Sequence, residues 1–182
     1  LSLHDARPIC GSAPDDVNRY APESLAALCR LVFDQTATRK PGKTDVTISE
    51  FRAQADDHVR NELVLIAVND DMPFLYDSLI GEINEQGARI LAVFHPIMNV
   101  TRDGEGIRGA NGATFRESVI VLVLDSMLGE DKRDTLVAGA KNTFTQVRLA
   151  VRDWRKMITH LKETIAGLQQ NPPPVSREEL NE

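Results

Sequence analysis

The clearest hydrophobic pattern in the chain is a strand-like run followed by a helix-like one. The letters LVLIAV at 63–68 are all apolar and mostly branched, which predicts a buried strand. After them, apolar residues recur at steps of three and four from Met72 to Ile83, the spacing of one helix face. Gly87 stands where a left-handed residue would end that helix. We expect the apolar face of this helix, with Tyr76, to lie on a sheet.

Two further apolar segments predict a pair of antiparallel strands. Residues 88–100 and 117–126 flank the Gly-rich stretch TRDGEGIRGANGATF, which predicts a hairpin loop. Pro96 marks an edge or a bulge in the first of these strands. With a helix after them, these elements have the β-α-β-β-α order of a ferredoxin-like fold. The sequence therefore predicts an α+β protein with an antiparallel sheet and helices on one face.

The segments on either side are less regular. From residue 22 to residue 38, apolar residues have helical spacing with a proline near the start. Residues 45–51 (DVTISEF) alternate imperfectly and predict a short edge strand, and the polar stretch at 54–62 predicts a loop. We expect the following organisation: a non-native or disordered lead (1–16), an N-terminal helix (17–44), a β-α-β-β core (45–130), a long helix (131–170) and a Pro-rich linker to further domains (171–182).

The last helix carries a heptad pattern. Its apolar residues follow alternating steps of three and four: Phe144, Val147, Val151, Trp154, Ile158, Leu161, Ile165 and Leu168. From Leu136 to Leu168 such a helix is about 50 Å long, whereas an ordinary strand is only about 20 Å long. The second half must therefore find another partner, either the N-terminal helix of the same chain or another domain or subunit. We expect an interaction seam formed by Val151, Trp154, Ile158 and Leu161.

Composition restricts the partners of the chain. It has 182 residues and a net charge of −6, and its pI near 5.3 argues against non-specific binding to nucleic acid. No apolar run approaches the roughly 20 residues that cross a bilayer. Cys10 and Cys29 are too few for a disulfide framework and lack CxxC spacing, which suits a reducing cytosol. We expect a cytoplasmic domain without nucleic-acid or membrane partners.

No motif in the chain predicts catalysis. GEGIRG at 104–109 matches GxGxxG, but a dinucleotide site needs this pattern between a strand and a helix. Here it lies between two expected strands, which favours a flexible loop. His95 has no second histidine or cysteine nearby, whereas zinc takes three or four ligands, so a structural histidine is expected. Serine nucleophile elbows, HExxH and Walker A patterns are missing. We therefore assign no catalytic, cofactor-binding or metal-binding residue.

Two adjacent acids, Asp70 and Asp71, follow the buried strand where it gives way to the helix. An aspartate at a helix N-cap accepts hydrogen bonds from free amides and complements the helix dipole. Pro73 suits the first turn of the same helix, so the pattern favours capping. The alternative is a turn that contacts a ligand or effector through Asp70, Asp71 and Pro73. General acid–base catalysis would need a partner group in a cleft, and the sequence indicates none.

Three stretches together resemble a known family. They are NDDMPFLYDSLIGEINEQGARILAVFHPIMNV, RESVIVLVLD and QVRLAVRDWRKMITHL. Over residues 17–170 the chain resembles the N-terminal region of the large bacterial NAD-specific glutamate dehydrogenases. The resemblance implies an ACT-like domain upstream of the catalytic region. The parent enzyme converts L-glutamate, NAD and water to 2-oxoglutarate, ammonium and NADH, and its NAD- and glutamate-binding residues would lie outside this chain.

The same resemblance implies where a ligand would bind. ACT domains often bind an amino acid at a dimer interface beside the first strand–helix turn, which commonly has an acid or amide, then Pro-Gly, then an apolar pair. The matching positions are Asp71, Pro73, Phe74 and Leu75, so Phe74 replaces the glycine. Glycine lets a ligand approach the backbone closely, whereas a phenylalanine would fill space or pack inward. ACT folds also have a strand after the second helix, and we expect residues 45–51 to supply it instead.

The sequence therefore predicts a non-catalytic regulatory and assembly domain of an NAD-dependent glutamate dehydrogenase. Its partners would be downstream domains or sister subunits of the same enzyme, with an amino acid as a candidate effector. NAD would be a cofactor of the parent enzyme and not of this chain. One alternative is an oligomerisation module that acts through the long helix and has no ligand. The other is a free-standing ACT protein that senses amino acids.

Overall fold

The computed structural model describes residues 13–55 and 58–170. Contacts divide the chain into two compact units, Leu1–Val147 and Arg148–Glu182, which are described separately. Most of the expected lead and the whole expected linker at 171–182 lie outside the described residues. The elements are α1 (Pro14–Asn18), α2 (Pro22–Gln35), β1 (Asp45–Ala55), β2 (His58–Asp70), α3 (Leu75–Glu85), β3 (Ile90–Phe94), β4 (Ile97–Arg102), β5 (Ala113–Asp125) and α4 (Glu130–Gln170).

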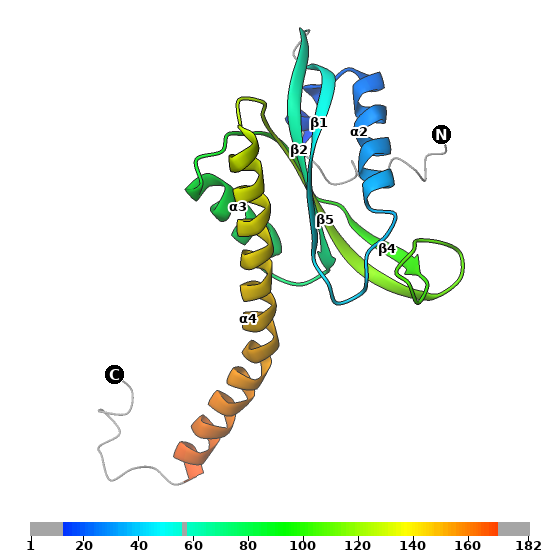
Figure 1. Ribbon diagram of the computed structural model, residues 1–182. Helices are drawn as coiled ribbons and strands as arrows, with labels where there is room; N and C mark the ends of the chain where they lie inside the picture. Colours follow the sequence, from blue (N-terminus) through cyan, green and yellow to red (C-terminus); the bar gives the residue numbers. More distant parts are fainter. Residues whose placement is uncertain (1–12, 56–57, 171–182) are drawn as a thin grey trace. The chain divides into compact units, whose positions relative to one another are not determined.

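The five strands of the described chain form one antiparallel sheet. Its order is β1-β2-β5-β3, and β4 pairs with the other end of β5 (Figure 1). The expected place of residues 45–51 is confirmed, because β1 lies beside β2, where an ACT fold has its last strand. The strand is longer than expected and continues to Ala55. The loop expected at 54–62 is wrong, since Ala55 pairs with His58 and β2 begins there.

The pairing of β3 and β4 explains the role of Pro96. The expected strand at 88–100 is two shorter strands, interrupted at His95 and Pro96, and both pair with β5 at one edge of the sheet. Proline has no amide hydrogen for a ladder, so an edge position is one of the few that it tolerates. Its carbonyl still accepts a hydrogen bond from the amide of Val119, at 3.0 Å. The interruption that Pro96 predicts is therefore confirmed.

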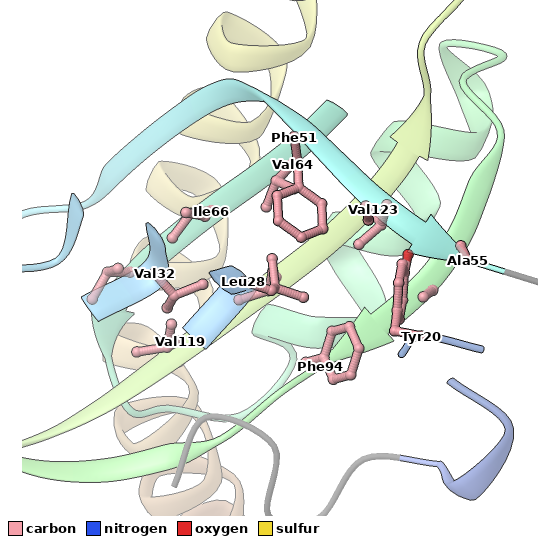
Figure 2. Close-up of a cluster of buried hydrophobic side chains, with 14 residues drawn as sticks. Tyr20, Leu28, Val32, Phe51, Ala55, Val64, Ile66, Phe94, Val119 and Val123 are labelled. Atoms are coloured by element: carbon pink, nitrogen blue, oxygen red, sulfur yellow. The ribbon is translucent and has the colours of Figure 1, made fainter. Parts of the chain in front are cut away.

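Both faces of the sheet are covered, which accounts for the unbroken apolar run in β2. Successive strand residues point to opposite faces, and the side chains of Val64, Ile66 and Val68 pack with Leu28 and Val32 of α2 (Figure 2). Figure 1 shows α3 and the first part of α4 on the side of the sheet away from α2. The expected α+β, ACT-like class is confirmed, and α2 adds a layer on the second face.

The first part of α4 buries its apolar stripe. Leu136, Ala140 and Phe144 are almost fully buried, and Val147 is 7% exposed. A hydrogen bond from the Thr143 hydroxyl to Glu82 Oε2, at 3.0 Å, ties this part of α4 to α3. The glycine at Gly139 leaves room for the Glu82 and Gln86 side chains, which a Cβ there would displace. The N-terminal half of the heptad stripe is thus part of the core of the first unit.

In the second unit the same stripe is uncovered. Trp154 and Leu161 are each 55% exposed, Ile165 and Leu168 are nearly as exposed, and Val151 and Ile158 are half-buried. In the first unit, the buried residues of α2 are Leu28, Cys29 and Val32, and Leu28 and Val32 belong to the core cluster on the sheet. Within the described residues, no helix is both long and apolar enough to cross a membrane.

Candidate functional site

The turn between β2 and α3 does not have the geometry that the sequence favours. Asp70 is the last residue of β2 and lies opposite Glu117 in the β2–β5 register. The amide of Asp71 donates to the carbonyl of Arg116 at 2.9 Å. Helix α3 begins only at Leu75, its N-cap is Phe74, and no side chain caps it. The expected capping by Asp70 and Asp71 is therefore wrong, because the strand continues two residues further than the apolar run indicates.

Phe74 has a backbone conformation that glycine adopts readily and other residues rarely adopt. Its φ of +71° lies in the left-handed region, and within the described chain it is the only residue other than glycine that has a positive φ. This conformation costs an L-residue about 1–2 kcal/mol. Its ring is 58% exposed, so the expectation that it fills space or packs inward is wrong. The turn thus combines a left-handed residue with an exposed aromatic side chain.

A buried charge cluster lies beside this turn. Glu117, on β5, accepts from the Nη2 of Arg39 at 2.6 Å, and from Arg102 through Nε at 2.6 Å and Nη2 at 2.8 Å. All three residues are at most 3% exposed. Arg39 lies between α2 and β1, and Arg102 is the last residue of β4. A buried carboxylate is tolerated when it is paired and fully hydrogen-bonded, which is the arrangement here.

The same arginines fasten the neighbouring loops to the turn. Arg39 donates to Asp70 Oδ1 at 2.8 Å and to the carbonyl of Lys43 at 2.6 Å. Arg102 donates to the carbonyls of Thr36 and Gly106, at 3.1 and 2.8 Å. The loop at 103–112 is therefore held at several points rather than flexible as expected. GEGIRG lies in this loop between β4 and β5, whereas a dinucleotide-binding motif lies between a strand and a helix.

The structure explains why residue 106 of this loop is a glycine. Its φ is +85°, and a Cβ on it would lie 2.6 Å from the carbonyl oxygen of Arg39. That close approach lets the Gly106 carbonyl accept from the Arg39 amide at 2.9 Å. The glycine of the motif thus serves backbone packing between two loops.

The pKa of Glu117 reflects competing effects. Burial raises it, but the hydrogen bonds and charges of Arg102 and Arg39 outweigh burial, and the pKa is lowered from its ordinary value. Glu117 is therefore ionised at neutral pH. A carboxylate held between two arginines is a poor general base, since both of its oxygens already accept hydrogen bonds from guanidinium groups. The cluster thus acts as a clamp, in the sense that Arg39 links Glu117 of β5 to Asp70 at the start of the turn.

A second group of polar contacts near the turn is more exposed. Asp71 pairs with Arg116 at 2.7 Å, and the Arg116 side chain is 67% exposed. His95 shares a hydrogen bond of 2.8 Å with the Ser118 hydroxyl, and its ring stacks on Tyr76 with centroids 5.3 Å apart. Burial lowers the pKa of His95, and the charges of Asp71 and Asp77 partly oppose this. His95 thus has the hydrogen-bonded, structural setting expected for it, and Tyr76 covers it.

The structure brings only some of the expected site residues together. Asp70, Asp71 and Pro73 share the β2–α3 turn, and both acids have arginine partners. The seam residues Val151, Trp154, Ile158 and Leu161 belong to the second unit. Whether either set binds anything stays a prediction. Among the described residues, no group of three His, Cys, Asp or Glu side chains could hold a metal ion.

The arginine–glutamate cluster escaped the sequence interpretation. A signal for Arg102 exists, since it continues the inward alternation of Val100 on β4 and is buried in the same way. A buried arginine demands a buried acid, and Glu117 opens the apolar part of the next strand. Arg39 gave no such signal, because it lies in an irregular segment with no periodicity.

The sequence of this chain is similar to known proteins. The family model described as "Glutamate dehydrogenase, ACT1 domain" matches residues 9–140. The chain belongs to this family. The glutamate dehydrogenase ACT1 domain is also similar to a curated relative, the NAD-specific glutamate dehydrogenase of Halomonas elongata, with 26% identity over 116 residues. That match covers 60% of the present chain but only 7% of the relative. The chain thus spans only a small part of the length of this relative, and the expected family is confirmed.

Proposed function

We propose that this ACT1 domain is a non-catalytic regulatory and assembly domain of a cytoplasmic, NAD-dependent glutamate dehydrogenase. The family match supports the identity of the parent enzyme, since the relative that this chain resembles is an NAD-specific glutamate dehydrogenase. The exposed apolar seam on α4 supports a role in assembly. Oxidation of L-glutamate to 2-oxoglutarate, with NAD and water consumed and NADH and ammonium produced, would take place in the rest of the parent polypeptide.

The polar groups near the turn support a non-catalytic role. Asp70, Asp71 and Glu117 each have an arginine partner, and a catalytic acid or base must instead reach a substrate. The purified chain should give no glutamate-dependent NADH when it is assayed at 340 nm, where NADH absorbs. Turnover that follows the concentration of the chain and survives repurification would contradict this part of the proposal.

The uncovered seam supports the assembly role. Trp154, Leu161, Ile165 and Leu168 expose apolar surface along one helical stripe, and such stripes mark docking surfaces. The partner would be a downstream domain or a sister subunit of the same enzyme. Exposed tryptophans are frequent anchors of such interfaces, so Trp154 is expected to contribute most to association.

An amino-acid effector at the β2–α3 turn would refine the regulatory role. A ligand carrying both an ammonium and a carboxylate group could exchange with the pair between Asp71 and the exposed Arg116. Titration calorimetry with a panel of amino acids tests this. Heat that saturates for one amino acid and is lost in Asp71→Asn would support an effector at the turn, whereas no heat from any of them would leave assembly alone.

A further inference from the structure

A cavity lies at the end of the sheet away from the β2–α3 turn. It has a volume of about 440 Å³, and its lining includes Arg19, Arg60, Glu62, Arg89 and Asp125. Glu62 is eight residues before Asp70 on β2, a separation of about 26 Å along a strand. The cavity is therefore distinct from the turn and its charge cluster. Its volume falls within the range of small-molecule sites, roughly 300–1,000 Å³.

One residue that lines the cavity, Glu62, is a buried carboxylate whose charge is paired. Glu62 is 2% exposed and accepts from Arg19 Nη2 at 2.7 Å and from the Tyr20 hydroxyl at 2.8 Å. Arg19 also lies over the Tyr20 ring, 5.6 Å from its centroid. Burial, followed by the hydrogen bond to Glu62, raises the pKa of Tyr20, so the phenol stays protonated. Both oxygens of Glu62 thus have donors, and Arg19 balances its charge.

The remaining charges favour an anion. Besides the Arg19–Glu62 pair, the lining has two arginines, Arg60 and Arg89, and one acid, Asp125. The lining thus contains three arginines and two acids, in a chain whose net charge is −6. Asp125 lies directly across from Glu62 in the β2–β5 register and accepts from the Met127 amide at 3.1 Å. Arg89 is exposed, and among the described residues its guanidinium has no hydrogen-bond or ion-pair partner.

We propose that this cavity binds a small anion whose carboxylate or phosphate group is held by the Arg89 guanidinium. Guanidinium groups match the two oxygens of a carboxylate or phosphate in a bidentate arrangement. The lining also includes two further polar residues, Asn61 and Ser126, and one apolar residue, Leu91. This inference is independent of the proposed function, because it uses neither the turn nor the seam.

Titration calorimetry of the full chain tests the proposal with two probes, inorganic phosphate and succinate, at ionic strength held constant with chloride. At least one probe should bind saturably. Binding of phosphate alone would indicate a phosphorylated ligand, and binding of succinate alone would indicate a carboxylate ligand. Arg89→Gln should weaken binding about tenfold, since a charged hydrogen bond contributes about 1.5–3 kcal/mol. Arg30→Gln, which removes an exposed arginine of α2, is the matched control and should bind like the wild type.

A third variant, Asp125→Asn, should change the affinity for the anion in the opposite direction. Asp125→Asn removes the negative charge that would repel the ligand and keeps an oxygen for the Met127 amide. It should therefore tighten binding. Circular dichroism of the free variants checks that the exposed positions leave the fold intact. The proposal is overturned if neither probe binds saturably, or if Arg89→Gln and Arg30→Gln bind equally well.

Discussion

Glu117 is the residue on which the polar side of the β2–α3 turn depends. It is 1% exposed and holds two buried arginines, so neutralising it leaves uncompensated charge in the interior. Glu117→Gln should lower the free energy of unfolding by at least about 3 kcal/mol in urea denaturation. Asp71→Asn, which removes an exposed pair on the same turn, is the control and should cost under about 1 kcal/mol. Equal effects of the two changes would show that the cluster is not a clamp.

The pKa of Glu117 adds a pH dependence with a defined sign. Its pKa in the folded chain is below the ordinary value of 4.5. Its contribution to stability is therefore complete above about pH 4.5 and is lost as the pH falls through the lower, folded pKa. Urea denaturation between neutral and acidic pH should show this loss in the wild type. Glu117→Gln should lack that component, and a variant that follows the wild-type profile would contradict the assignment.

Phe74 predicts an inversion of the usual order of alanine and glycine. At most positions alanine is the more stabilising of the two, because glycine gains more entropy on unfolding. At a φ of +71° an L-residue is strained, and glycine is not. Phe74→Gly should therefore be more stable than Phe74→Ala by about 1 kcal/mol, as measured by thermal denaturation. An alanine variant as stable as the glycine variant would show that the turn relaxes to another conformation.

At this scale the sequence predicts positions better than roles. It located the turn, the left-handed stop at Gly87 and the interruption at Pro96, because each depends on a local backbone preference. It assigned Asp70 and Asp71 to capping, because the continuation of β2 beyond the apolar run depends on pairing with β5. Long-range pairing leaves no trace in local periodicity.

The element with the sharpest contrast is α4, whose heptad stripe is buried in the first unit and exposed in the second. Phe144→Ala should cost about 3–5 kcal/mol of folding free energy, because it opens a cavity in the core. Leu161→Ala, at an exposed position of the same stripe, should change stability by no more than about 0.5 kcal/mol. Chemical denaturation of the chain distinguishes them. A large cost for Leu161→Ala would mean that the seam is already covered within the chain.

The hairpin of β1 and β2 shows why some elements escape sequence interpretation. Ala53 and Ala55 are buried and alternate with exposed Arg52 and Gln54, so the period of two continues to the end of β1. Alanine is a weak hydrophobic signal, and the polar residues dominate the stretch. Strand pairing along the whole hairpin, from Asp45 with Val68 to Ala55 with His58, overrides that weak local preference.

For the whole molecule, the order of elements predicted a ferredoxin-like antiparallel sheet. The resemblance to ACT domains added the expectation that residues 45–51 replace the last strand, and the place of β1 beside β2 confirms it. The covering of the second face by α2 was not predicted. An amphipathic helix shows that it buries a stripe but not against which surface. The two faces of β2 are equally apolar, and only the packed structure shows that Val64, Ile66 and Val68 face α2.

We propose that this ACT1 domain assembles its parent enzyme through the seam of α4. Sedimentation velocity of the parent enzyme tests it most directly, with Trp154→Ala and Ile158→Asp compared with the wild type. Lys156→Ala is the matched control, since residue 156 is exposed and lies about 200° around the helix from residue 154. We expect both seam variants to sediment as smaller or dissociating species and the control to sediment like the wild type. Seam variants that retain the full wild-type assembly would contradict the account.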